Sequence, residues 1–185
     1  MTPGGGVAGR LADLRDGFDR SFSEPPRQPP GRTDLLAIRV ADLGYAVRLS
    51  TITGLWADRP TTPLPGPVPD LVGLASFRGT VVPVYDLAAL LGHAGHATIR
   101  WLMLATDTPP LALGFGAVDG HLQVPATAVA PVGDSGQTSR GLVSELVTTG
   151  HTVLRVIDIR AVRATVAARA GATVAGREAV QRGTA

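Results

Sequence analysis

Two apolar stretches, 71–77 and 80–85, constrain the fold of this chain most, because only Arg78 and Gly79 separate them. Runs of this length and composition are typical of β-strands. A two-residue connection forces the strands to run antiparallel and requires a positive φ, which glycine adopts without steric cost. We therefore predict a tight hairpin from whose tip the Arg78 side chain projects.

An alternation of apolar with small or charged residues begins earlier, at Leu35. It runs through 35–40 and resumes at 45–49, on either side of a turn at 42–44. Period-two alternation predicts a hairpin with one buried face. The Pro-rich segment 59–69 lies between this hairpin and the next, and it is predicted to be a loop.

The second half of the chain repeats this plan. Its strand-like segments are 99–105, 111–118, 122–124 and 153–159. Asp86 and Asp158 end similar apolar-x-Val-x-Asp-apolar sequences, and we expect each to cap the turn after its strand. The recurrence predicts a mainly-β body of two small lobes with one architecture, lobe one about 33–92 and lobe two about 98–160.

Helical periodicity is confined to the two ends of the chain. Near the N-terminus, apolar residues recur three and four apart at Val7, Leu11, Leu14, Phe18 and Phe22. They predict an amphipathic helix that ends at a Pro-rich linker, so 1–32 form a leader whose stripe either packs on the body or binds a partner. An Ala- and Arg-rich run through Arg169 predicts a closing helix, with 166–185 as a tail that frays from Gly171 onward.

The excess positive charge lies in that tail. All seventeen basic residues are Arg. Residues 33–159 hold seven Arg and ten acids, a net charge of −3, whereas 160–185 hold five Arg and one Glu, a net charge of +4. A nucleic-acid interface needs clustered cations and stacking aromatics, so we expect no nucleic-acid partner for the body.

The composition also bears on the compartment. The chain has no Cys, which excludes disulfides, thiolate metal sites and a Cys nucleophile. Its apolar runs fall far short of the roughly 20 residues that a membrane helix needs, and the N-terminus lacks the features of a signal peptide. We therefore expect a cytoplasmic protein that does not insert into the membrane.

Candidate metal and nucleotide motifs are weak. His93 and His96 have a spacing that two ligands of one metal can have, but flanking glycines favour a loop and no third ligand is evident. Residues 114–120 resemble a dinucleotide fingerprint but miss its third glycine. No Walker lysine exists, because the chain has no Lys. We expect no metal and no cofactor.

Catalytic residue types are present without catalytic spacing. Ser144, His151 and Asp158 are the residue types of a hydrolase triad, but no nucleophile elbow surrounds Ser144. We therefore expect no enzymatic activity. The alternative of another class is an enzyme or ligand-binding barrel that uses the groove between the lobes, which needs converging polar groups with shifted pKa values.

One stretch carries a specific signature. It combines an apolar-Gly-apolar segment at 72–74, the Arg78-Gly79 turn and the sequence Val-Val-Pro-Val-Tyr-Asp-Leu at 81–87. This pattern resembles the CheW family of chemotaxis coupling proteins, and the resemblance extends over about 34–165. It implies a fold of two small five-stranded β-barrels.

The resemblance also implies a function and a set of contact residues. CheW-like proteins are non-enzymatic adaptors that couple the regulatory domain of a CheA-type histidine kinase to the cytoplasmic tip of methyl-accepting chemoreceptors. The implied partner-binding positions are Ile52, Gly73 and Arg78, with Phe77 and Gly79 beside Arg78. Ile52 could equally be a core residue, and Gly73 could instead allow close backbone approach. A kinase pathway outside chemotaxis is the alternative within the family.

The chain departs from the family pattern at three places. Gly54 stands where the family usually has Glu, so an acidic contact is missing. Ser76-Phe77 replaces the Asn-Leu that precedes the Arg-Gly turn, and Asp119 comes one residue late in the second lobe. These departures bear on the choice of partner more than on the fold.

Overall fold

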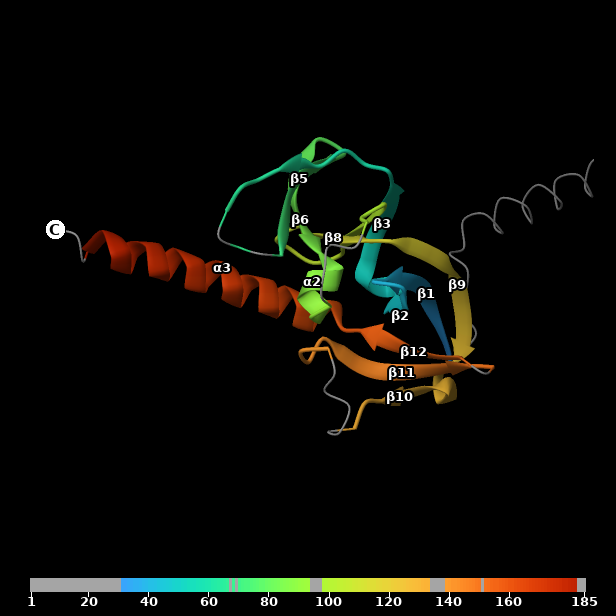
Figure 1. Ribbon diagram of the computed structural model, residues 1–185. Coiled ribbons are helices and arrows are strands. Elements are labelled where there is room, and N and C mark those ends of the chain that lie inside the picture. The colour runs from blue at the N-terminus through green and yellow to red at the C-terminus, as the bar shows by residue number, and fades with distance from the viewer. Residues whose placement is uncertain are drawn as a thin grey trace, which may run out of the picture. The chain divides into compact units, whose positions relative to one another are not determined.

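Figure 1 shows the computed structural model, which describes residues 31–66, 68, 70–93, 98–133, 139–150 and 152–182, with side chains to Gly171. Residues 33–185 form one unit, separate from 1–32. The predicted leader helix and its linker lie outside the described residues, as do His96 and His151.

The first of two sheets has six strands in the order β10-β11-β12-β2-β1-β9. Its strands are β1 (Arg32–Val40), β2 (Leu43–Arg48), β9 (Ala117–Pro125), β10 (Val129–Pro131), β11 (Val143–Thr149) and β12 (Thr152–Ile157). The predicted hairpin of β1 and β2 is present, but its turn is Ala41-Asp42, both with positive φ, and not 42–44. The chain turns earlier because Leu43 already pairs with Val40.

The second sheet has six strands in the order β3-β7-β8-β6-β5-β4. Its strands are β3 (Ile52–Ala57), β4 (Thr62–Pro63), β5 (Leu71–Phe77), β6 (Thr80–Asp86), β7 (Trp101–Ala105) and β8 (Ala112–Phe115). The predicted β5–β6 hairpin is confirmed, since Phe77 pairs with Thr80 across Arg78 (φ 49°) and Gly79 (φ 84°). Short 3₁₀ turns, η1 (Leu49–Thr51) and η2 (Ala126–Ala128), lead into β3 and β10.

The mainly-β prediction is confirmed, but the two sheets do not follow the predicted lobe boundaries of 33–92 and 98–160. β1 and β2 lie in the sheet of the later strands, whereas β7 and β8 lie in the sheet of the earlier ones. The exchange is made by two parallel pairings, β2 with β12 and β6 with β8. Each sheet has six strands. The exchange was not predicted, because strand order depends on long-range contacts that local periodicity does not report.

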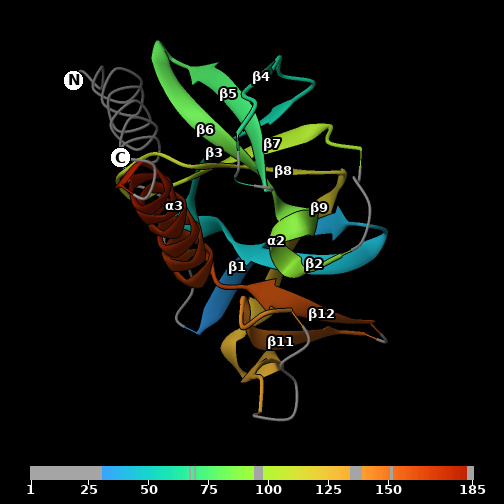
Figure 2. The same cartoon turned by 60° about the vertical axis from the view of Figure 1, so that its left-hand side comes forward.

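The main apolar cluster lies where the two sheets meet. It draws on β1, β2, β7 and β8, and on the short helix α2 (Leu87–Leu91), which lies between the sheets in both views (Figure 1, Figure 2). Its fully buried members include Ile38, Val47, Leu87, Leu90, Met103 and Leu113. Two smaller clusters lie within the lobes, one in each. The lobes are therefore joined by core packing.

The prediction that Asp86 and Asp158 cap the turns after their strands is confirmed, and each of these turns begins a helix. The Asp86 carboxylate accepts hydrogen bonds from the backbone N–H of Ala88 (2.8 Å) and Ala89 (3.4 Å) at the start of α2. Asp158 accepts equivalent bonds from Arg160 (2.8 Å) and Ala161 (3.2 Å) at the start of α3 (Ile159–Arg182). α3 continues through the predicted tail, since its alanines and arginines are strong helix formers. None of the helices in the described ranges is long and apolar enough to span a membrane.

Candidate functional site

The tip of the β5–β6 hairpin projects Arg78 into solvent. Arg78 and Gly79 are both exposed, and within the described ranges the Arg78 guanidinium has no hydrogen-bond or ion-pair partner. Beside the tip, Ser76 and Val81 face each other across the hairpin, and Val81 is 62% exposed. The tip thus combines a free cation with an exposed apolar side chain.

Phe77 lies on the opposite, inner face and is only 3% exposed. Its ring meets the Trp56 ring edge-on, with centroids 4.7 Å apart. The Arg59 guanidinium lies 5.3 Å from the centre of the Phe77 ring and also donates to the carbonyl of Ser76. Phe77 therefore supports the tip from below, through an aromatic contact and a cation–π contact.

Trp56 and Arg59 were missed in the sequence. β3 and β5 are separated by three strands in the sheet order, so the contact between Trp56 and Phe77 requires the sheet to curl toward a barrel. Alternation along either strand cannot report that curvature. The sequence signal for this contact is limited to the presence of two aromatic residues on strands of one lobe.

Gly73 is buried and serves close backbone approach. A Cβ atom at Gly73 would lie 2.1 Å from the carbonyl oxygen of Thr62 on β4, which pairs with β5 there. The steric interpretation of this glycine is therefore confirmed.

Ile52 and Gly54 lie on β3, on the N-terminal side of Trp56, which is the β3 residue that contacts Phe77. Ile52 is half-buried and packs against the main apolar cluster. A Cβ atom at Gly54 would lie 2.3 Å from the Trp56 ring, so a glutamate there would displace that ring. Glycine at position 54, where the family usually has glutamate, thus leaves room for the Trp56 ring, which supports the hairpin. The structure brings together Phe77, Arg78 and Gly79, but not Ile52.

The weak catalytic motifs fall on structural positions. Ser144 is exposed on β11, and its carbonyl accepts a hydrogen bond from the N–H of Val132. Asp158 caps α3. Gly114 lies in β8 against Ile99. In the part of the chain that the structure describes, no three His, Asp or Glu side chains are grouped as metal ligands.

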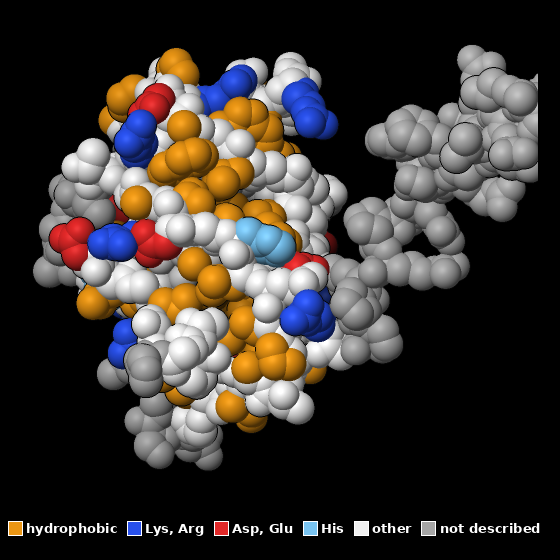
Figure 3. Space-filling model, turned by 90° about the vertical axis from the view of Figure 1, so that its right-hand side faces the viewer, with side chains coloured by type: hydrophobic (Ala, Val, Ile, Leu, Met, Phe, Trp, Pro, Cys, Tyr) orange, Lys and Arg blue, Asp and Glu red, His pale blue; other side chains and the backbone are white. Residues whose placement is uncertain are grey.

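Burial raises the pKa of the Tyr85 phenol, which lies on β6 beside the main apolar cluster. Figure 3 shows a face on which apolar side chains gather in patches and charged side chains lie scattered between them. Such a face suits contacts with another protein better than contacts with a polyanion.

Comparison with known proteins gives consistent sequence relatives. The family model described as CheW-like domain matches residues 34–166. "Chemotaxis protein CheW" of Rhizobium meliloti (strain 1021) is 28% identical over 107 residues, which are 56% of this chain and 69% of that protein. "Probable chemotaxis protein CheW" of Rhizobium etli is 32% identical over 62 residues, which are 34% of this chain and 40% of that protein.

A solved structure shows the same fold. The crystal structure of the scaffolding protein TtCheW from Thermoanaerobacter tengcongensis superposes with a TM-score of 0.63 and covers 69% of this chain and 89% of its own. The two sequences are 15% identical, so the likeness concerns the arrangement of the strands.

Proposed function

This chain belongs to the family of CheW-like domain proteins, and on that premise we propose that it is a non-enzymatic adaptor of chemosensory signalling. The match of the family model to 34–166 carries the proposal. The adaptor would act in the cytoplasm and couple the regulatory domain of a CheA-type histidine kinase to the cytoplasmic tip of chemoreceptors. Two lobes joined by one apolar cluster suit this role, since each can present a surface while their relation stays fixed.

Arg78 is the proposed anchor for a partner. Its guanidinium is exposed and unpaired within the described residues, so binding does not have to break an existing ion pair. The planar fork of five donors suits a carboxylate or the free carbonyls at the end of a helix. Val81 beside it supplies an apolar contact, and central Arg residues flanked by apolar contacts are frequent hot spots.

The other proposed contact residues shape the tip. Gly79 permits the two-residue turn, and Phe77 fixes the turn on the Trp56 ring. Gly73 lets β4 approach β5, and Ile52 holds the far end of β3 on the core. Their substitution should therefore weaken partner binding mainly by moving Arg78 or the strands around it.

The test measures binding of Arg78→Ala to a purified kinase regulatory domain and to a receptor-tip fragment. We expect Kd to rise by roughly thirtyfold for at least one partner, which corresponds to about 2 kcal/mol, while the melting temperature stays at the wild-type value. Arg160→Ala is the matched control, because Arg160 is also exposed and lies on α3. Equal binding by Arg78→Ala and wild type would contradict the assignment.

Two further outcomes separate the alternatives. Binding of the kinase domain without binding of any receptor tip would favour a kinase pathway outside chemotaxis. Failure of the wild-type chain to bind either partner would remove the adaptor proposal.

A further inference from the structure

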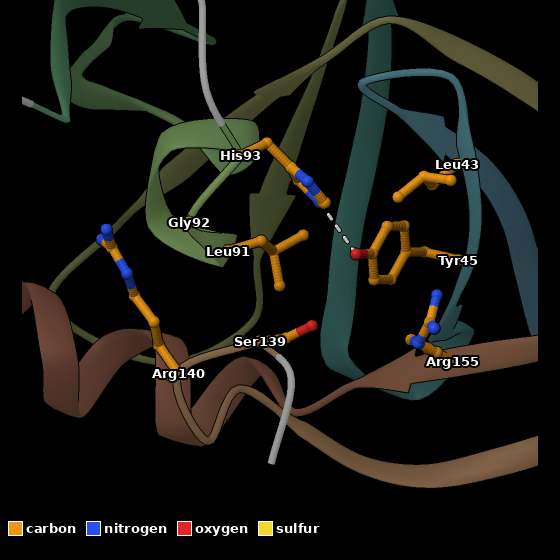
Figure 4. Close-up of a pocket in the computed structure, with 8 residues that line it drawn as sticks. All are labelled: Leu43, Tyr45, Leu91, Gly92, His93, Ser139, Arg140 and Arg155. Atoms are coloured by element: carbon orange, nitrogen blue, oxygen red, sulfur yellow. Dashed lines mark hydrogen bonds between the residues drawn. The ribbon is translucent and has the colours of Figure 1, made fainter. Parts of the chain in front are cut away.

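A recess of about 390 Å³ opens beside the junction of the two sheets. Four segments far apart in the sequence frame it: the start of β2, the end of α2, the Ser139–Arg140 segment and β12 (Figure 4). Its lining residues are Leu43, Tyr45, Leu91, Gly92, His93, Ser139, Arg140 and Arg155. A volume in this range is sufficient for a small molecule.

Among the residues that the structure describes, the lining is rich in hydrogen-bond donors and includes no carboxylate. Arg140, Arg155 and His93 all line the recess. Arg155 pairs with Tyr45 in the parallel register of β12 and β2, which places both side chains on one face. Arg155 has no hydrogen-bond or ion-pair partner among the described residues, whereas Arg140 donates to the carbonyl of Ala89 (3.2 Å) at the end of α2.

The His93 ring is held in place by Tyr45. The hydroxyl of Tyr45, which is 1% exposed, is hydrogen-bonded to Nε2 of His93 at 2.8 Å, and the two rings meet edge-on. The Ser139 residue is 9% exposed, and its hydroxyl points into the space between Leu91 and Tyr45 (Figure 4). The His93 side of the recess is therefore fixed by Tyr45.

The carboxylates of the framing elements are used elsewhere. Asp86 caps α2, and Asp158 caps α3. Glu145 on β11 accepts three hydrogen bonds from the Arg48 guanidinium, the shortest at 2.7 Å. Asp42 precedes Leu43 but does not line the recess. Within the described ranges, no acid of the lining competes for Arg155.

We propose that this recess binds a small organic anion, whose carboxylate or phosphate group lies against Arg155, His93 and the hydroxyl of Ser139. A guanidinium fork with neighbouring hydrogen-bond donors is a favourable setting for such a group. Leu43 and Leu91 line the same recess and would contact the apolar part of the ligand. The proposal does not depend on the adaptor role, because it rests on residues away from the β5–β6 hairpin.

The test uses the full chain labelled with ¹⁵N and two probes, inorganic phosphate and malonate, each titrated at constant ionic strength. We expect saturable shifts of the backbone amide signals of His93, Ser139 and Arg155. Shifts with phosphate alone identify a phosphate site, shifts with malonate alone a carboxylate site, and shifts with both a site for either group. Identical shifts with sodium chloride, or none with either probe, would overturn the proposal.

Two variants localise the binding. Arg155→Gln should weaken binding by about tenfold or more, because it removes the charge and keeps most of the side-chain length. Arg160→Gln, an exposed Arg outside the recess, should bind as wild type does. Ser139→Ala is a second variant that leaves every charge in place, and it should weaken binding less. Wild-type affinity in both Arg155→Gln and Ser139→Ala would place the anion elsewhere.

Discussion

Two regions of the molecule start alike and end differently. β5 and β6 form a hairpin that leads through Asp86 into α2, and β11 and β12 form a hairpin that leads through Asp158 into α3. β6 and β12 each pair in parallel with a strand from the other half of the chain. However, α2 has 5 residues, whereas α3 has 24 and extends away from the sheets (Figure 1).

The residues after the shared Asp account for the difference. α2 ends at Gly92, whose φ of 88° is left-handed and whose N–H donates back to the carbonyls of Ala88 and Ala89. α3 has no glycine at the equivalent place and continues through an Ala-rich sequence. α2 is therefore a short plug of the core, and α3 is a long arm that starts in the core.

The two helices also hold the lobes by different forces. Four of the five residues of α2 are buried and apolar. α3 follows β12 of one sheet and contacts loops of the other through arginines: Arg163 donates to the carbonyls of Asp107 and Pro109, and Arg169 is paired with the buried Asp70. Apolar burial thus joins the lobes at α2, whereas α3 adds charged contacts to the apolar burial of Ile159 and Val162 in its first turns.

We expect the largest effect from a substitution that weakens the apolar contacts of α2. Leu90→Ala should lower the free energy of unfolding by about 3 kcal/mol, since Leu90 is fully buried in α2 and its removal leaves a cavity between the lobes. Val166→Ala, at a half-buried position of α3, should lower it by only about 1 kcal/mol. Urea denaturation measures both, and equal losses would mean that α3 is as much a part of the core as α2.

The next prediction concerns the ion pair between Arg169 of α3 and Asp70. Arg169→Ala should lower the free energy of unfolding by about 2 kcal/mol, because it leaves the Asp70 carboxylate, 5% exposed, without its guanidinium. Asp70→Asn in the Arg169→Ala background should recover part of this loss, since it removes the unpaired charge. A double variant no more stable than Arg169→Ala would show that the charge of Asp70 is not what Arg169 compensates.

The sequence predicted the features that local chemistry determines. The Arg78-Gly79 turn and the caps at Asp86 and Asp158 depend on residues within a few positions, and the structure confirms all three. Strand exchange between the lobes was not predicted, because the β2–β12 and β6–β8 pairings join segments that are distant in the sequence.

The same reason explains what was missed at the candidate sites. Trp56 meets Phe77 only when the sheet curls, and the recess beside Arg155 forms only when four distant segments converge. Neither arrangement produces a residue spacing that can be recognised in the sequence. His93 was considered as a metal ligand, whereas the structure gives it a hydrogen bond to Tyr45.

The smallest expected effects use one substitution with opposite signs in the two helices. Gly92→Ala should lower the free energy of unfolding by about 1 kcal/mol, because an L residue is strained at φ 88° and its Cβ would lie 2.9 Å from Nε of Arg140. Gly171→Ala should raise it by up to about 1 kcal/mol, since Gly171 lies within α3, has open space around it, and alanine is the better helix former. Thermal unfolding of both variants, with helix content followed by circular dichroism, measures the pair. If Gly171→Ala raises helix content without raising the melting temperature, the outer part of α3 folds independently of the lobes, and the division between plug and arm becomes sharper. If Gly92→Ala is neutral, the end of α2 is set by the packing of Leu91 and Arg140 around it, and the explanation from Gly92 is wrong.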